Sequence, residues 1–198
     1  MNVYDFDNTI YDGESLYDFF IFSMKKKPKL IRYFPLILYT LIFYKLRMIS
    51  IEKFYKLANK MSSVFQDFSD ENVVDQFVEE FWQKNRHKLK PKYLEMLTDK
   101  DVIITGSPRM LISGIMNELA VLPSNIVCSE LNLSTGCFDF ICLRENKVSV
   151  FKEKFPNAVI DKFYTDSLND IPMMKLAKCS YLVKGYKEPK LIDPKINR

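Results

Sequence analysis

The chain has 198 residues and 47% apolar content, enough for one sizeable hydrophobic core, with or without a small second lobe. Its 29 basic and 25 acidic residues leave a net charge of +4, which is too small for a protein built to bind nucleic acid. One histidine and four cysteines without a Cys-x-x-Cys pair exclude a multi-histidine metal site and a zinc ribbon.

Residues 2–7 are rich in strand-forming side chains and end at the turn formers Asp7, Asn8 and Thr9, which predicts a short buried strand. Alternation along this strand places Asp5 and Asp7 on the same side of its end. Two neighbouring carboxylates repel, so one tends to take up a proton unless a cation lies between them. Such a pair suits a metal-bound nucleophile beside a general acid and base, although Asp and Asn also cap turns after strands.

Residues 14–95 contain no glycine, and their apolar residues recur at helical spacing, which predicts an all-helical block. The part from 19 to 51 carries seven basic residues and no acidic one, so subtracting +7 from the total of +4 leaves −3 for the rest. Twelve uncharged residues separate Arg32 from Lys45, and as a helix they span about 18 Å, too short for the roughly 30 Å hydrocarbon core. Residues 25–47 therefore either pack as a helix against their neighbours or contact an anionic membrane surface.

Strand-like and helix-like segments alternate after residue 100. Extended segments are expected at 101–105, 125–128, 159–165 and 179–183, helices at 110–119, 148–155 and 171–177, and a hairpin between 131 and 143. This alternation is typical of an α/β fold, here a Rossmann-like parallel sheet with helices on both faces. We therefore expect a catalytic core of residues 1–13 and 96–198, with a helical cap of residues 14–95 inserted after the first strand.

Polar residues follow the expected strands, at the edge where ligands of parallel sheets bind. The hydroxyl of Thr105 and the N–H groups around Gly106 suit an anion, although such groups also cap helices. Asp166 and Asp170 lie four residues apart across a strand-to-helix turn, where both carboxylates reach one hard cation. Lys147 begins an expected helix and by itself is typical of a solvated surface charge. The joint occurrence of these groups favours one shared site.

Four motifs follow one another along the chain: Asp5-Phe6-Asp7-Asn8-Thr9, Thr105-Gly106-Ser107, Lys147, and Asp166-Ser167-Leu168-Asn169-Asp170. With these motifs the chain resembles the haloacid dehalogenase-like hydrolase superfamily over nearly its whole length. The insertion at residues 14–95 is similar to the small helical cap of the phosphoserine phosphatase-like branch, the subfamily IB type.

The resemblance implies a phosphatase that hydrolyses a phosphate monoester through an aspartyl-phosphate intermediate. Asp5 would be the nucleophile and Asp7 the general acid and base. Dehalogenases of this superfamily lack an acidic residue at the position of Asp7. Thr105, Gly106 and Lys147 would bind the phosphoryl oxygens. The implied cofactor is Mg²⁺, and its ligands would be Asp5, the backbone carbonyl of Asp7 and Asp166, with Asp170 as a direct ligand or as a partner of the ligands.

Glu14 lies nine residues after Asp5, the place where phosphoserine phosphatases carry a glutamate that faces the substrate. Those enzymes also use a cap arginine, and the nearest cations to such a position here are Lys56 and Lys60. Arginine and lysine are not interchangeable at a bidentate carboxylate clamp. The difference argues against phosphoserine as the substrate.

Three functions follow as expectations. We favour a Mg²⁺-dependent phosphatase of the cytoplasm that acts on a small phosphorylated substrate. The alternative is a peripheral membrane phosphatase for a lipid phosphate such as a phosphatidylglycerophosphate-like substrate, because segment 25–47 is similar to the cap of phosphatidylglycerophosphatase C-like relatives. A remote third is a binding module without catalysis. The N-terminus lacks the pattern of a secretory signal, and we expect the cysteines to be reduced thiols.

Overall fold

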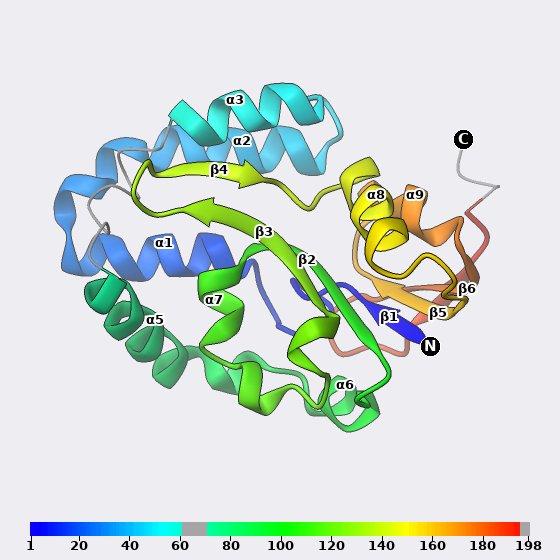
Figure 1. Cartoon of the computed structure of the whole chain (residues 1–198). Helices are drawn as coiled ribbons and strands as arrows, with labels where there is room; N and C mark the ends of the chain where they lie inside the picture. Colours follow the sequence, from blue (N-terminus) through cyan, green and yellow to red (C-terminus); the bar gives the residue numbers. More distant parts are fainter. Residues whose placement is uncertain (61–70, 195–198) are drawn as a thin grey trace.

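The computed structural model describes residues 1–60 and 71–194. Within these residues the chain forms a seven-stranded sheet with the order β4-β3-β2-β1-β5-β6-β7 (Figure 1). The strands are β1 (Asn2–Tyr4), β2 (Val102–Pro108), β3 (Ile126–Asn132), β4 (Cys137–Phe140), β5 (Ile160–Thr165), β6 (Ala177–Leu182) and β7 (Lys190–Ile192). Neighbouring strands are parallel except for β4 on β3 and β7 on β6. The predicted α/β fold with a mostly parallel sheet is confirmed.

Helices fill the long connection between β1 and β2 and separate the later strands. They are α1 (Ser15–Lys26), α2 (Phe34–Lys45), α3 (Ile51–Lys60), α5 (Glu71–Asn85), α6 (Pro91–Met96), α7 (Arg109–Ser113), α8 (Glu145–Lys154) and α9 (Ile171–Met174). The first five lie between β1 and β2 in sequence, so the described part of the predicted insertion is helical. The division into a core and a cap at residues 14–95 stays a prediction.

Alternate residues of the central strands enter two separate buried clusters, one on each face of the sheet. One cluster combines strand residues with α5 and α7 and includes Tyr4, Ile103, Tyr164, Trp82 and Leu111. The other combines strand residues with α8 and α9 and includes Val3, Ile104, Phe163, Phe151 and Met173. Figure 1 shows α8 and α9 side by side, with α5, α6 and α7 along the other side of β2 and β3. Helices therefore cover both faces, as predicted.

The antiparallel pair β3–β4 is the hairpin predicted between residues 131 and 143, and Gly136 in its turn has a φ of 68°. Figure 1 shows that this hairpin extends alongside α2 and α3. It is hydrogen-bonded to α3, because the Tyr55 hydroxyl donates to the carbonyl of Phe138 and the Phe138 amide donates to Asn59 Oδ1 at 3.0 Å. The hairpin and the helical insertion thus form one packed unit beyond the carboxyl ends of the strands.

Three elements differ from the sequence-based expectation. The helix predicted at 110–119 is divided at Gly114 into α7 and a 3₁₀ helix, and a Cβ atom on Gly114 would lie 2.6 Å from Trp82 Cδ1 of α5. The helix predicted at 171–177 is shorter, because Ala177 already pairs with β5 as the first residue of β6. The C-terminal segment, for which no element was predicted, contributes β7 as an antiparallel edge strand.

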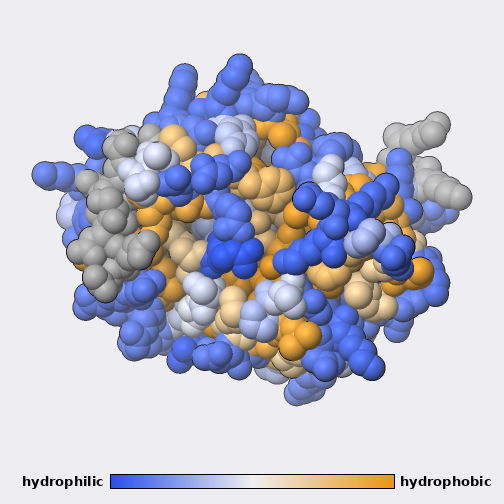
Figure 2. All heavy atoms as spheres, in the orientation of Figure 1, coloured by the Kyte–Doolittle hydropathy of each residue, from blue (hydrophilic) through white to orange (hydrophobic). Residues whose placement is uncertain are grey.

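Segment 25–47 forms the end of α1, the 3₁₀ helix Pro28–Tyr33 and α2. Five large apolar side chains in and just after it are exposed, and the most exposed are Ile31 at 67%, Leu46 at 62% and Met48 at 64%. On the face of the molecule in Figure 2, hydrophobic residues reach the surface between charged ones. Of the helices that the structure describes, none is both long and apolar enough to cross a membrane.

Candidate active site

The predicted site residues gather at the carboxyl ends of β1, β2 and β5, where they line a cavity of about 190 Å³. Asp5 and Asp7 follow β1, Gly106 and Ser107 lie near the end of β2, Asp166 and Asp170 follow β5, and Lys147 belongs to the first turn of α8. Thr105 is the one member of the predicted set that is buried behind the cavity surface, because β2 continues past it to Pro108. Its neighbours Gly106 and Ser107 form that part of the wall.

Asp5 and Lys147 form a buried ion pair at the centre of the site. Lys147 Nζ donates to Asp5 Oδ1 at 3.0 Å and to Asp170 Oδ2 at 2.9 Å, so one ammonium bridges carboxylates from two strand ends. Only 7% of Asp5 and 2% of Lys147 is exposed. Burial raises the pKa of Asp5 well above its ordinary value, although Lys147 opposes the rise. Burial alone would lower the pKa of Lys147, but Asp170 and Asp5 raise it well above its ordinary value.

Asp7 is held by the start of α1 and by the end of β2. Its Oδ1 accepts from the amide of Ser15 at 2.7 Å, and its Oδ2 accepts from the Ser107 hydroxyl at 2.6 Å. Thr105 Oγ1 lies 3.5 Å from the same Oδ2. Burial raises the pKa of Asp7, while the hydrogen bonds from Ser107 and Ser15 lower it. The carboxylate therefore also accepts from the first amide of α1, whereas the sequence suggested a cap of the turn after the strand.

The loop after β5 supplies two further carboxylates with different surroundings. Asp170 Oδ2 accepts from the Thr165 hydroxyl at 2.8 Å as well as from Lys147. Asp166 accepts no hydrogen bond from the described residues, and burial together with nearby Asp170 raises its pKa to about 6. Four carboxylates thus surround a single buried lysine, which leaves an excess of negative charge when all are ionised.

The donor atoms fit a hard divalent cation bound through oxygen. Asp5 Oδ2, Asp170 Oδ1, the carboxylate of Asp166 and the carbonyl of Asp7 accept no hydrogen bond from residues 1–60 and 71–194. Within the same residues, no three His, Cys, Asp or Glu side chains are grouped so that they could hold a metal ion together. Mg²⁺ needs no such cage, because it is held by one or two carboxylates and keeps several waters.

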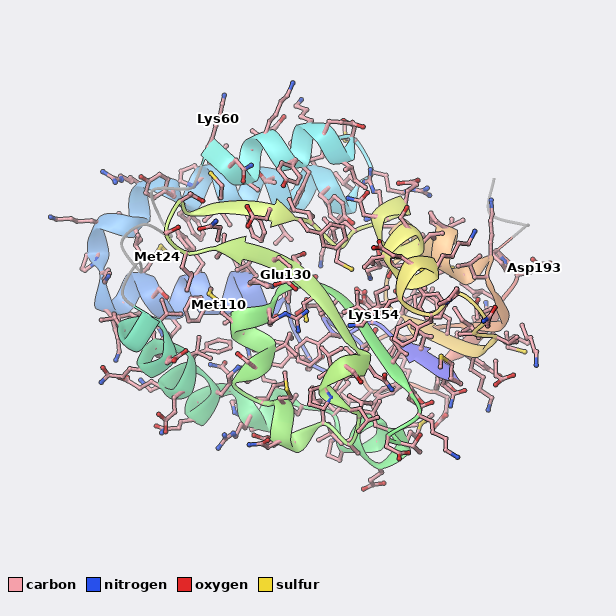
Figure 3. All side chains as sticks on the ribbon, viewed as in Figure 1. Met24, Lys60, Met110, Glu130, Lys154 and Asp193 are labelled. Atoms are coloured by element: carbon pink, nitrogen blue, oxygen red, sulfur yellow. The ribbon has the colours of Figure 1, made fainter. Side chains whose placement is uncertain are left out.

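Glu14 lines the cavity, but its carboxylate is already bound within the protein. Its Oε1 accepts from Asn8 Nδ2 at 2.6 Å and lies 2.6 Å from Lys45 Nζ at the end of α2. Burial and the nearby Asp7 raise the pKa of Glu14 to about 7, although Lys45 opposes the rise. The other cations considered from the sequence are exposed and do not line the cavity, and Lys60 projects away from the molecule in Figure 3.

The end of α2 is hydrogen-bonded to the loops that surround the site. The side chains that make these contacts were not among the predicted site residues. The carbonyl of Tyr44 accepts from Asn169 Nδ2 at 3.2 Å and from Arg144 Nη2 at 3.3 Å. The guanidinium of Arg144 also lies 4.6 Å from the centre of the Tyr44 ring. These side chains come from the loops before α8 and after β5, so α2 ends directly over the carboxylates.

Lys90 is a second residue that sequence reasoning missed. Its side chain is buried, and its Nζ donates to the carbonyl of Asn8 at 2.5 Å, which fixes the loop that follows β1. Asn8 has a φ of 56°, a left-handed conformation that asparagine tolerates. Nothing in the local sequence distinguishes this lysine from its exposed neighbours, whereas Ser107 was visible as the second hydroxyl of its motif.

The chain is similar to a known protein family in sequence and to solved structures in fold. Residues 3–175 match the family model described as haloacid dehalogenase-like hydrolase. A protein of unknown function from Bordetella pertussis Tohama I has a similar structure, with a TM-score of 0.71 and 16% identity, over 88% of this chain and 85% of that one. A phosphoserine phosphohydrolase-like protein from Francisella tularensis is also similar, with a TM-score of 0.60 and 20% identity, over 91% and 86%.

A third similar structure is the phospho-aspartyl intermediate analogue of a phosphoserine phosphatase, with a TM-score of 0.55 and 13% identity, over 90% of this chain and 83% of that one. These identities show a shared fold. No curated protein sequence matches the chain.

Proposed function

Because the chain belongs to the haloacid dehalogenase-like hydrolase family, we propose that it is a phosphatase that hydrolyses a phosphate monoester through a phosphorylated Asp5. The observation that carries this proposal is the buried pair of Asp5 and Lys147, 3.0 Å apart, beside a hydrogen-bonded Asp7 in the same cavity. A nucleophile, a cation for the phosphoryl oxygens and a proton carrier are the parts that such a reaction needs.

The reaction divides into two displacements at phosphorus. In the first, the carboxylate of Asp5 attacks phosphorus, the bond from phosphorus to the alcohol oxygen breaks, and Asp7 gives that oxygen a proton. In the second, water attacks phosphorus, Asp7 takes a proton from that water, and the bond to Asp5 breaks to release inorganic phosphate. Lys147 and the N–H groups around Gly106 stabilise the charge on the phosphoryl oxygens in both steps.

The implied cofactor is Mg²⁺. Its ligands would be the carboxylates of Asp5 and Asp166 and the carbonyl of Asp7, with Asp170 binding it directly or through water. When bound, it supplies positive charge next to the phosphoryl group and offsets the repulsion between the carboxylates. The excess negative charge around Lys147 supports this assignment.

In this proposal residues 14–95 act as a cap over a core formed by residues 1–13 and 96–198. The contacts from Asn169 and Arg144 to the carbonyl of Tyr44 support it, because they hold α2 against the loops that carry the catalytic groups. The cap therefore surrounds the alcohol part of the substrate.

The proposal is tested by the turnover of a generic phosphate ester in the presence of Mg²⁺. Asp5→Asn should abolish phosphate release, since an amide oxygen is a far weaker nucleophile than a carboxylate. Asp75→Asn changes an exposed aspartate of α5 and serves as the matched control that keeps wild-type activity. Phosphate release by the purified Asp5→Asn protein at the wild-type rate would overturn the proposal.

A second candidate is a peripheral membrane phosphatase that acts on a lipid phosphate, and the exposed side chains of Ile31, Leu46 and Met48 favour it. Basic residues accompany them, and Lys25, Lys29 and Arg47 are exposed. Apolar side chains beside basic ones suit the surface of an anionic membrane.

This second candidate predicts that the protein co-sediments with phosphatidylglycerol vesicles at low salt and not with phosphatidylcholine vesicles. Changing Lys25, Lys29 and Arg47 to glutamine should abolish the co-sedimentation. Changing the exposed Lys152 and Lys154 should preserve it. Absence of binding to the anionic vesicles would exclude this candidate and leave the first one intact.

A further inference from the structure

The cavity that holds the catalytic carboxylates continues between α1, α2, α3 and the β3–β4 hairpin. Its wall there is built mainly from apolar side chains, which include Leu16, Phe20, Ile37, Leu41, Phe54 and Phe138. They come from four separate elements that meet only in the fold. A leaving group attached to a phosphate at Asp5 has to extend into this part of the cavity, because the strands and Lys147 close the other side.

The charges in this wall cancel one another. Apart from the carboxylates and Lys147 at the catalytic centre, the charged side chains among the described lining residues are Glu14 and Lys45. They pair at 2.6 Å, and Glu14 also accepts from Asn8. An ionised carboxylate on the alcohol would therefore have to take Lys45 from Glu14 or lie unpaired against apolar side chains, and either outcome costs free energy.

We propose, on the basis of the phosphatase function above, that the substrate is the phosphate monoester of an apolar alcohol or phenol. The cavity of about 190 Å³ also has to hold the phosphoryl group, and an apolar cavity of about 150 Å³ accommodates a benzene ring, so the remaining space suits a short alkyl chain or a single ring at most. Burial of these carbon atoms against Phe20, Leu41 and Phe54 supplies binding energy that a polar alcohol lacks.

The deciding experiment compares the specificity constant, kcat/KM, across methyl, ethyl and butyl phosphate, whose leaving groups have similar acidity. Each added methylene in an apolar pocket changes kcat/KM by roughly tenfold or more, and butyl phosphate has three more than methyl phosphate, so it should exceed methyl phosphate by about a thousandfold. Phosphoserine and glycerol 3-phosphate should fall below butyl phosphate. Equal kcat/KM along the series, or a preference for phosphoserine, would overturn the inference.

A variant locates the effect in the cavity. Leu41→Asn places an amide in the apolar wall and should lower the ratio of butyl to methyl phosphate turnover by about tenfold. Leu122→Asn changes an exposed leucine and should leave the ratio unchanged. An unchanged ratio in Leu41→Asn would contradict the inference. The wild-type series decides the question even where this variant does not fold.

The outcomes separate this inference from the function on which it rests. If no ester releases phosphate in the presence of Mg²⁺, the phosphatase function itself fails. If all esters are hydrolysed regardless of their alcohol, only the inference about the alcohol fails. A further arm distinguishes the source of the alcohol: dodecyl phosphate in phosphatidylglycerol vesicles should exceed soluble butyl phosphate for a membrane source and fall below it for a soluble source.

Discussion

Lys147 and Asp5 are 142 residues apart in the chain, yet Lys147 Nζ lies 3.0 Å from Asp5 Oδ1 and both side chains are buried. Asp5 follows the central strand β1, and its amide donates to the carbonyl of Tyr164 at 2.8 Å, so the backbone of the nucleophile is fixed by β5. Lys147 is fixed by the first turn of α8. The pair therefore depends on the whole sheet for its geometry and on neither residue alone.

The first prediction concerns the charge that Lys147 supplies. Lys147→Met should lower the free energy of unfolding by about 3 kcal/mol, because it leaves Asp5 and Asp170 buried without their cation. Phosphate release should also become undetectable or nearly so. Urea denaturation monitored by Trp82 fluorescence measures the first effect. The control Lys154→Met removes an exposed lysine of the same helix (Figure 3) and should change the free energy by less than about 0.5 kcal/mol.

A second prediction concerns the hydroxyl that holds Asp7. Ser107→Ala removes a hydrogen bond of 2.6 Å to the ionised carboxylate, which should lower kcat by about tenfold to a hundredfold. Because this hydrogen bond lowers the pKa of Asp7, its loss should also move the corresponding limb of the kcat profile to higher pH. Ser149→Ala, on the exposed face of α8, is the matched control. A normal profile and a normal kcat in Ser107→Ala would show that Ser107 does not position Asp7.

A third prediction follows from the ion pair of the half-buried Glu14 with the exposed Lys45. The pKa of Glu14 is raised from 4.5 to about 7 in the fold, mainly by burial. A carboxyl group with a raised folded-state pKa contributes stability that is complete below its unfolded pKa and is lost as pH rises through its folded pKa. The wild-type protein should therefore lose free energy of unfolding, relative to Glu14→Gln, between about pH 4.5 and pH 7.

Thermal unfolding of both proteins in metal-free buffer at pH 5 and pH 8 measures this difference. Glu14→Gln should gain in Tm relative to the wild type on going from pH 5 to pH 8. The control Glu95→Gln, which changes an exposed glutamate of α6, should follow the wild type at both pH values. A constant difference between Glu14→Gln and the wild type would mean that Glu14 does not titrate in this range.

Periodicity in the sequence predicted much of the sheet, because β2 and β3 begin with short apolar runs and polar turn residues follow β1 and β5. Helix ends were less predictable, since they depend on tertiary contacts. Gly114 ends α7 where Trp82 of α5 packs against it, and no local pattern shows that contact. The edge strand β7 lies in a basic, proline-containing tail and exists only because β6 offers a free edge.

In the site, too, some features could be predicted from the local sequence and others depend on tertiary contacts. Alternation along β1 predicted that Asp5 and Asp7 act together, and both line the cavity. The burial of Lys147 and the hydrogen bond from the Ser107 hydroxyl to Asp7 depend on tertiary contacts, so the local sequence does not predict them. Glu14 was expected to face a substrate, yet the fold supplies a partner for it from α2, which was far away in sequence.

The most direct test of the account is the identity of the residue that carries the phosphoryl group during turnover. We expect acid-quenched protein, digested and analysed by mass spectrometry, to show one phosphoryl group on the N-terminal peptide at Asp5. With an aryl phosphate whose leaving group needs no acid, the signal should be absent in Asp5→Asn and should accumulate in Asp7→Asn, where hydrolysis of the acyl phosphate lacks its base. Phosphorylation of another residue, or turnover by wild-type protein without any phosphorylated protein, would contradict the account.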